Sequence, residues 1–513
     1  MAEAVEGDVG GRTAIGAGWL VAWRMITRAL GLVSTLVLAR ILVPTDFGLV
    51  AMATAFSAAT DTLSELGLQD ALVRRPDTGR GLYDTAFTMQ VGRGFLTAGV
   101  IAAGAPVASA WFSEPRLLPI LLLLAGLSAA SGFENIGIVE FRRTLRFSME
   151  FKLLFLPRIG QFVATVAAAW LLRSYWALVI GIAVSKLSRV AMTYVVHSYR
   201  PGLTLSQWRD LVGFSFWTWA SSLASLVWER SDPFILGRVL GAGDLGLYLL
   251  AAEIAVLPIT ELVAPASRAL FAGFSAAQNQ GTDTIGAALP VVATLLLIVV
   301  PLTIAVSASS GYIVAALLGP QWAAAQPLIA TFAWLCVFSP FSWVCTTVLM
   351  ARGRVRQNFY AVAMAAALKI AVIYVASLTA RMGVVAMAAV VCVALESVLF
   401  IVQLQRSGGA ARWRDLGGSF ARISLAAGVT IAALHWSGYG WRLAAATMPS
   451  GPALAEGMLV GAASALGCGA FQLALWWVVG KPDGPEARFV SLATRLSLPW
   501  LSRTASAAAR HQR

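Results

Sequence analysis

The sequence predicts an all-α protein that crosses a membrane many times. Of its 513 residues, 58% are hydrophobic and only 12% are charged. Soluble domains carry about 25% charged residues, so this chain has too few polar side chains to cover a water-facing surface. Its apolar stretches are long enough to cross a hydrocarbon core about 30 Å thick at about 1.5 Å per residue. An internal repeat is the third observation, because it predicts two related lobes.

Fourteen candidate spans follow one another along the chain. They lie at residues 15–39, 45–69, 84–107, 117–138, 151–172, 175–197, 211–236, 245–270, 285–307, 324–350, 357–380, 383–405, 417–438 and 453–478. Residues 308–324 contain YIVAALLGPQW, which could form a short interfacial helix before the tenth span. Residues 487–503 mix apolar side chains with arginines, so they could form an amphipathic helix on the membrane surface or a weakly ordered basic tail.

Basic residues cluster in alternate loops, which is typical of an inner-membrane protein whose basic loops face the cytoplasm. These loops follow the second, fourth, sixth, tenth and twelfth spans. Both termini are therefore expected in the cytoplasm of a bacterial cell. The net charge of +13 resides mainly in these loops and the tail, so it does not indicate nucleic-acid binding.

A phrase of thirteen residues occurs twice, as LARILVPTDFGLV at 38–50 and as LGRVLGAGDLGLY at 236–248, with an offset of 198 residues. Six spans separate the copies, so the repeats are parallel and related by an axis along the membrane normal. The predicted organisation is two six-helix lobes followed by two extra helices. Its parts are a cytoplasmic N-terminus (1–14), an N-lobe (15–197), a cytoplasmic linker between the lobes (198–210), a C-lobe (211–405), two further helices (406–480) and a basic cytoplasmic tail (481–513).

The repeated phrase has a structural interpretation. Its arginine can reach the outer headgroups, its aspartate can cap the next helix, and its glycine permits close approach of neighbouring helices. These pairs are Arg40 and Arg238, Asp46 and Asp244, and Gly48 and Gly246. We favour this interpretation over direct contact with a substrate.

Motifs for catalysis or cofactor binding are missing. The three histidines lie far apart, and the four cysteines sit inside apolar segments, so neither a metal site nor a disulfide framework is expected. Residues 241–246 read GAGDLG and match GxGxxG, but they lie between two spans rather than in a βαβ unit. We therefore expect a transporter without a cofactor rather than an enzyme.

Charged residues inside the spans are the candidates for function, because ionisable groups at membrane depth are costly and rarely face lipid. The first half contributes the cations Arg24, Arg28 and Arg93. Arg24 and Arg28 are four residues apart and share one helix face. Since guanidinium groups match phosphate oxygens, we expect these arginines to bind an anionic group such as a phosphate.

The second half contributes a different set of charges. The acidic candidates for binding a coupling Na+ or H+ are Glu229, Asp232, Glu253, Glu261 and Glu396. The alternative is a buried structural ion-pair network, for example Lys369 with Glu396. In the register of the repeat Arg24 aligns with Ser222, so the scaffold is duplicated while its charges are not.

Four motifs carry a resemblance to a known family. They are the repeated LxRxLxxxDxGL phrase, YDTAFTMQVGRG at 83–94, FRRTLRFSMEF at 141–151 and YWALVIG at 175–181. With these motifs the chain resembles the polysaccharide-transporter branch of the multidrug/oligosaccharidyl-lipid/polysaccharide (MOP) flippase superfamily. Within that branch it is most similar to bacterial repeat-unit flippases of the Wzx or colanic-acid exporter type.

The resemblance implies two six-helix lobes that enclose a cavity. It also implies that the protein transports by alternating access, opening the cavity to one side of the membrane at a time. The implied substrate is a polyprenyl-pyrophosphate-linked oligosaccharide, the repeat unit of an exopolysaccharide or lipopolysaccharide, moved from the cytoplasmic to the periplasmic leaflet of the inner membrane. Implied partners are membrane lipids and a polysaccharide polymerase or export machinery. Arg24, Arg28 and Arg93 would form the cationic face of the cavity.

Two other functions stay open. A cation-coupled antiporter of small amphipathic compounds would have a dominant set of carboxylates, whereas the first span here carries Arg24 and Arg28 in place of the acidic residue of the multidrug branch. A membrane glycosyltransferase or polymerase would need a large outer loop or a carboxylate-rich loop, and the outer loops are short. Among the tryptophans, Trp217, Trp219 and Trp228 are the candidates for contact with sugar.

Overall fold

The fold is that of a computed structural model, which describes residues 26–64, 72, 79–144, 147–208, 216–257, 260, 270, 273–278, 280, 284–406, 413–482 and 484–491. The chain divides into two compact units, Met1–Leu247 and Tyr248–Arg513. This division by packing falls later than the linker at 198–210. The lobe boundaries expected from the order of the spans remain a prediction.

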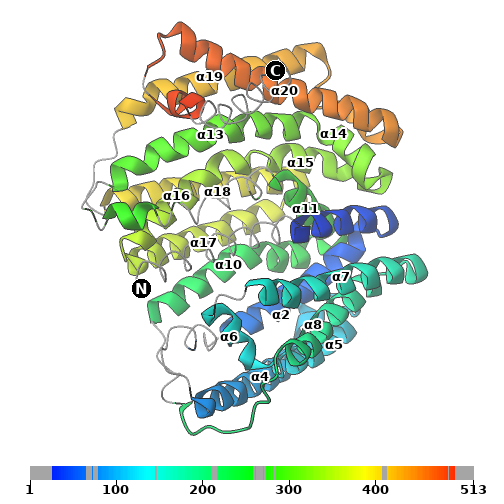
Figure 1. The fold of residues 1–513 in the computed structure, drawn as a ribbon. Helices are drawn as coiled ribbons and strands as arrows, with labels where there is room; N and C mark the ends of the chain where they lie inside the picture. The colour runs from blue at the N-terminus through cyan, green and yellow to red at the C-terminus, as the bar shows by residue number, and fades with distance from the viewer. Residues whose placement is uncertain are drawn as a thin grey trace, which may run out of the picture. The chain divides into compact units, whose positions relative to one another are not determined.

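The first unit consists mainly of long helices (Figure 1). A helix over residues 26–41 comes first. It is followed by α2 (Pro44–Leu63), α4 (Arg80–Phe112), α5 (Leu117–Ser131), η1 (Ile136–Ile138), α6 (Val139–Arg143), α7 (Phe147–Leu172), α8 (Trp176–Val196), α10 (Phe216–Val239) and α11 (Gly241–Ala255), the last of which continues into the second unit. The successive helices α4 and α5 pack against each other, as do α7 and α8. Short connections favour such antiparallel neighbours.

The start of α2 illustrates how the repeated phrase shapes the chain. Pro44 occupies the first turn, where its missing N–H costs no hydrogen bond. Asp46 accepts a hydrogen bond from the Val43 N–H at 3.2 Å through one carboxylate oxygen. Its other oxygen accepts one from the Tyr175 N–H at 3.1 Å, in the turn before α8. The predicted cap is confirmed, and the same carboxylate also fastens the α7–α8 turn to α2.

The second unit is arranged around α13 (Thr284–Ala308), which packs against α16, α19 and α20 and is buried along most of its length. The other elements are α14 (Ser310–Ile313), η2 (Val314–Leu318), η3 (Pro320–Ala325), α15 (Gln326–Phe332), α16 (Leu335–Ala351), α17 (Val355–Ser377), α18 (Met382–Arg406), α19 (Trp413–Ser437), η4 (Leu443–Thr447) and α20 (Ser450–Val478). A short helical turn over residues 485–491 follows α20.

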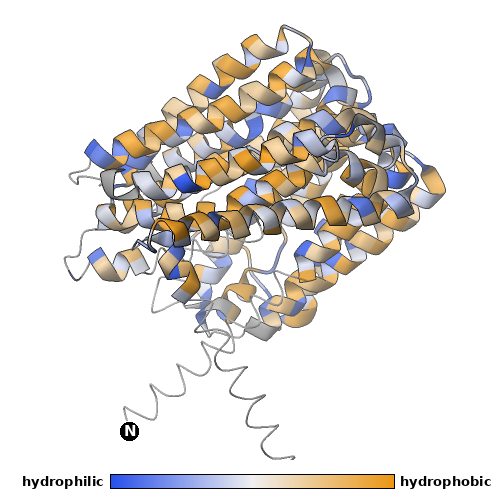
Figure 2. Ribbon diagram, turned by 90° about the horizontal axis from the view of Figure 1, so that it is seen from above, coloured by the Kyte–Doolittle hydropathy of each residue, from blue (hydrophilic) through white to orange (hydrophobic). Residues whose placement is uncertain are grey.

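The predicted all-α membrane fold is confirmed, and each expected span overlaps a helix. Within the described part of the chain, eight helices are long and apolar enough to cross a membrane, and a ninth span results if the bent pair Pro320–Phe332 and Leu335–Ala351 counts as one. This pair bends by 49°. Figure 2 shows apolar residues along most helices and polar ones concentrated toward their ends and loops.

Residues 308–324, which could form a short interfacial helix by sequence, are largely buried within the protein. They form α14, a π-helical turn and a 3-10 turn, and they bury Tyr312, Leu318 and Trp322 almost completely. The loop after α19 covers them, because the Gln326 side-chain amide donates to the Arg442 carbonyl at 3.0 Å and the Trp441 N–H donates to the Ala308 carbonyl at 3.0 Å. The apolar sequence of this segment therefore reflects burial within the protein rather than contact with lipid.

Candidate substrate site and its charged residues

The cationic candidates of the first unit lie on two helices. Arg28 lies on the helix over residues 26–41 and Arg93 on α4, and both are partly buried. Arg24 lies outside the described residues. The predicted common cationic face of these arginines therefore remains a prediction.

The sequence around Arg93 places it beside a tight helix contact. A Cβ atom at Gly94 would lie 2.9 Å from the Cα of Gly132 and 3.1 Å from the Ser128 carbonyl oxygen, so α4 and α5 meet backbone to backbone. One helical turn earlier, the buried Gln90 amide donates to the Gly132 and Glu134 carbonyls at 3.2 and 2.9 Å. These contacts fix the rotation of α4 about its axis and hence the side from which Arg93 projects.

The described acidic candidates lie on three helices, α10, α11 and α18. Glu229 and Asp232 both lie on α10, but Glu229 is exposed while Asp232 is only 9% exposed. Glu253 is exposed on α11, and Glu261 lies outside the described residues. Trp228 is partly buried on α10, whereas the side chains of Trp217 and Trp219 are outside the described part of the chain. Binding of a coupling cation by this set remains a prediction.

Lys369 and Glu396 lie on the neighbouring helices α17 and α18. Lys369 is only 8% exposed, and its positive charge acts on the partly buried Glu396 carboxylate. An ion pair between these two side chains stays a prediction. A role of Glu396 in ion coupling stays a prediction.

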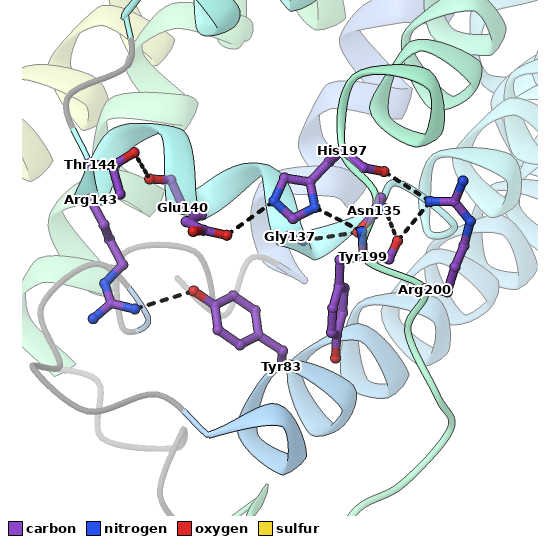
Figure 3. A network of polar contacts seen from close by, with 9 residues as sticks. All are labelled: Tyr83, Asn135, Gly137, Glu140, Arg143, Thr144, His197, Tyr199 and Arg200. Atoms are coloured by element: carbon purple, nitrogen blue, oxygen red, sulfur yellow. Dashed lines mark hydrogen bonds and ion pairs between the residues drawn. The ribbon is translucent and has the colours of Figure 1, made fainter.

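A polar network that the sequence did not predict lies where α4, α6 and α8 meet the linker (Figure 3). The Asp84 carboxylate accepts hydrogen bonds from the Tyr199 hydroxyl and from the Gly202 N–H, both at 2.6 Å. Burial and the bond to Asp84 raise the pKa of Tyr199, so its hydroxyl keeps its proton. Farther along, the Thr204 N–H donates to the Thr88 hydroxyl at 2.8 Å. The first part of the linker is thus fastened along the first turns of α4.

The other half of this network centres on Asn135 and His197. The fully buried Asn135 donates from its side chain to the Tyr199 carbonyl at 2.6 Å and accepts from the Gly137 N–H at 3.0 Å. His197 Nδ1 accepts from the Tyr199 N–H at 3.1 Å, so Nε2 carries the proton and donates to Glu140 at 3.1 Å. Asp84 belongs to the YDTAFTMQVGRG motif, but its partner Tyr199 lies more than a hundred residues later in the chain. Sequence patterns over a few neighbouring residues therefore do not predict this hydrogen bond.

Among the described residues, no group of three or more His, Cys, Asp or Glu side chains is placed so that it could hold a metal ion. All four cysteines are buried thiols. The polar groups that the structure does bring together serve packing of helices and fastening of the linker.

The model of a family described as polysaccharide biosynthesis protein matches residues 37–327 of the chain. The chain belongs to this polysaccharide biosynthesis family. Its match covers the repeated phrase in both copies and the motifs at 83–94, 141–151 and 175–181, which is where the sequence resemblance lies. The assignment to the polysaccharide-transporter branch is confirmed.

Curated relatives of the chain are named for polysaccharide biosynthesis, and one of them is named for transport. The chain is 25% identical over 361 residues to lipopolysaccharide biosynthesis protein WzxC of Escherichia coli, covering 68% of this chain and 72% of that protein. It is 26% identical to succinoglycan biosynthesis transport protein ExoT of Rhizobium meliloti, covering 62% of this chain, and 22% identical to teichuronic acid biosynthesis protein TuaB of Bacillus subtilis, covering 58%. The matches span 64% of ExoT and 62% of TuaB, slightly less than two thirds of each.

Two solved structures share the fold of the family. The lipid II flippase MurJ in an inward closed conformation superposes with a TM-score of 0.70 at 12% identity, covering 90% of this chain and 99% of that one. An inward-facing multidrug-resistance MATE transporter of the MOP superfamily superposes with a TM-score of 0.58 at 12% identity, covering 74% and 94%. The MOP-type fold is therefore confirmed.

Proposed function

We propose that this protein is a flippase that carries a polyprenyl-pyrophosphate-linked oligosaccharide from the cytoplasmic to the periplasmic leaflet of a bacterial inner membrane. Membership in the polysaccharide biosynthesis family, whose relatives include a named transport protein, is the observation that carries this proposal. The protein is a transporter rather than an enzyme. Its partners are the lipid-linked substrate, membrane lipids and a polysaccharide polymerase or export machinery.

Physical chemistry explains why such a substrate needs a carrier. The hydroxyl groups of a sugar lose their hydrogen bonds to water in hydrocarbon, and each loss costs roughly 2–7 kcal/mol. A polar site inside the protein replaces the water, while the polyprenyl tail can stay in lipid. Access alternates between the two sides, so the oligosaccharide is never exposed to the bilayer core.

The first unit supplies the charge that a pyrophosphate requires. Arg28 and Arg93 carry guanidinium groups on two of its helices, and guanidinium binds phosphate through two parallel hydrogen bonds. The sequence predicts that Arg24, four residues before Arg28, adds to this positive charge. The predicted C-lobe (211–405) would supply the coupling to Na+ or H+ through its acidic residues.

The test is a chromosomal deletion followed by analysis of lipid-linked intermediates in each leaflet. Loss of the protein should trap the oligosaccharide-lipid in the cytoplasmic leaflet. Complementation with Arg93→Ala should leave this accumulation in place at normal protein levels. Arg381→Ala, an exposed arginine between α17 and α18, is the matched control and should restore transport. Unchanged lipid intermediates together with new drug sensitivity would instead identify an antiporter.

A further inference from the structure

The turn that follows α8 is built around the His197 ring. Its Nδ1 atom accepts a hydrogen bond from the Tyr199 N–H at 3.1 Å, and its Nε2 atom lies 3.1 Å from a Glu140 carboxylate oxygen. A backbone N–H can only donate, so Nδ1 carries no proton here and Nε2 donates to Glu140. The turn therefore holds His197 as the neutral Nε2–H tautomer, with both ring nitrogens bonded (Figure 3).

The surroundings of Nδ1 leave little space for a different partner. A Cβ atom at Gly137 would lie only 2.6 Å from Nδ1 and 2.9 Å from the Cβ atom of Tyr199, so this side of the ring lies against the Gly137 backbone. The Phe141 ring contacts the imidazole edge to face, with ring centroids 5.3 Å apart. The His197 side chain is only 13% exposed. Another acceptor therefore reaches Nδ1 only if the turn opens.

A second proton on the ring is incompatible with this turn. Histidine is the side chain whose charge ordinarily changes between about pH 5 and pH 8. Both nitrogens of an imidazolium are donors, so the Nδ1–H of a charged His197 would point at the Tyr199 N–H. Two donors that face each other repel, and each is left without an acceptor in a partly buried place. Either the ring turns away or the linker moves, and both changes break the bond to Tyr199.

The charged neighbours on α6 are Glu140 and Arg143. Glu140 attracts an imidazolium, but its side chain is 56% exposed, and exposed ion pairs contribute little. Arg143 follows three residues later and donates to the Tyr83 hydroxyl at 3.3 Å. The attraction of α6 for a charged His197 is therefore weak.

The charged neighbours on the linker and on α4 are Arg200 and Asp84. Arg200 donates to the carbonyls of His197 and Tyr199 at 2.9 and 3.0 Å, so its positive charge lies at the same turn and disfavours a second one. The Asp84 carboxylate lies at the far end of the Tyr199 side chain, where it accepts the hydroxyl. The loss of the hydrogen bond at Nδ1 therefore outweighs the gain at Nε2, and the fastened turn favours neutral His197.

We infer that His197 is a pH-sensitive latch of the linker, which holds Tyr199 while its ring is neutral and releases Tyr199 when the ring takes up a second proton. The sign follows from proton counting, because the released turn accepts a proton that the fastened turn excludes. Alkaline conditions therefore favour the fastened linker, and acid favours the released one. The latch depends on neither the substrate nor transport, so its failure and that of the proposed function are separate results.

The first measurement follows the proton on the ring. The other two histidines are His435 and His511, so selective labelling with 15N-histidine yields few NMR signals, and His197→Asn identifies those of His197. At about pH 8 its two nitrogens should show the distinct shifts of the Nε2–H tautomer, and at about pH 5 both should show those of an imidazolium. A His197 ring that stays neutral down to about pH 5 would overturn the inference.

The second measurement follows the linker by the distance between two spin labels. Leu203→Cys on the linker and Leu96→Cys on α4 are exposed positions, while the four native cysteines are buried. The distance distribution should be narrow at about pH 8 and should broaden as His197 becomes charged. The control pair, Leu96→Cys with the exposed Leu171→Cys on α7, should keep its distance. An unchanged distribution for the linker pair, while His197 becomes charged, would contradict the latch.

Substitutions of His197 separate the proton from the ring. His197→Asn keeps an acceptor, because an Asn side chain can bond the backbone N–H two residues on, and it does not titrate. Its linker should stay fastened from about pH 8 to about pH 5, whereas the linker of His197→Ala should be released throughout. Glu140→Gln removes the attraction for an imidazolium and should move release to lower pH by less than about one unit. Release of the His197→Asn linker by acid, to the extent seen in the native protein, would assign the effect to another group and refute the latch.

Discussion

The Asp84 carboxylate holds the Tyr199 hydroxyl at 2.6 Å and thereby joins the first turns of α4 to a linker more than a hundred residues later in the chain. The same oxygen also accepts the Gly202 N–H. Residues 199–204 of the linker are thereby fastened to the first turns of α4.

Removal of the Asp84 carboxylate should release the linker. Asp84→Ala leaves the Tyr199 hydroxyl and the Gly202 N–H without their acceptor, at a cost of about 1–3 kcal/mol, whereas Tyr199→Phe removes one bond and costs about 1 kcal/mol. The rate of chymotrypsin cleavage after the exposed Leu203 in the native protein should rise for both variants, more for Asp84→Ala. Tyr360→Phe on α17 is the control, and equal cleavage of all four proteins would contradict the fastening.

Substitution of Gly94 should destabilise the first unit. A methyl group at this position would press against the Gly132 backbone, and overpacking of this kind costs about 1–3 kcal/mol. Denaturant unfolding in detergent measures the loss for Gly94→Ala. The matched variant Gly126→Ala on α5, where a Cβ atom meets open space, should be neutral or slightly stabilising. If both variants unfold at the same denaturant concentration, the close approach of α4 and α5 does not limit stability.

The Lys369–Glu396 pair offers a test between structure and ion coupling. In a structural pair, Lys369→Met alone leaves a poorly compensated buried carboxylate and should lower stability by about 3–5 kcal/mol. The double variant Lys369→Met with Glu396→Gln should recover most of this loss and should still flip its substrate. A coupling role for Glu396 predicts a different result, namely that Glu396→Gln and the double variant both fold normally but lose their dependence on Na+ or H+.

The helical turn at residues 485–491, which follows α20, is held against α19 by a buried ion pair. Arg422 on α19 binds Glu486 at 2.7 Å, and Glu486 is only 1% exposed. Glu486→Gln should therefore lower the free energy of unfolding by about 3–5 kcal/mol, while the apolar pair Arg422→Met with Glu486→Leu should be close to neutral. The more exposed pair of Glu114 with Arg116 is the control, since Glu114→Gln should cost about 1 kcal/mol or less. Equal losses at both pairs would show that burial does not set the strength of the Arg422–Glu486 bond.

The helices were predictable because burial in lipid demands long apolar runs, and such runs are local in the sequence. The cap made by Asp46 and the close approach at Gly48 were also predictable, because the same residues recur at one offset. The family was predictable from short motifs around Arg93 and Arg143, which the match over residues 37–327 confirms.

Features that depend on distant partners were missed. Asp84 shows no sign in the sequence that it binds Tyr199, and nothing local to Tyr312 or Trp322 reveals that a loop after α19 covers them. Apolar composition alone does not distinguish burial against lipid from burial against protein. The sequence also did not predict which acidic residues are buried. Glu229 and Asp232 lie on the same helix, yet Glu229 is exposed and Asp232 is buried.

The reciprocal contact of Gly48 with Ala242 and of Gly246 with Pro44 has the form of a homodimer interface written into one chain. In a symmetric dimer, residue i of one subunit touches residue j of the other, and the reverse contact occurs automatically. Gly48 meets the backbone at Ala242, and Gly246 meets the backbone at Pro44, within a single chain. The two copies keep both glycines of this shared interface while the charges near them differ, because Arg24 aligns with Ser222 in the register of the repeat.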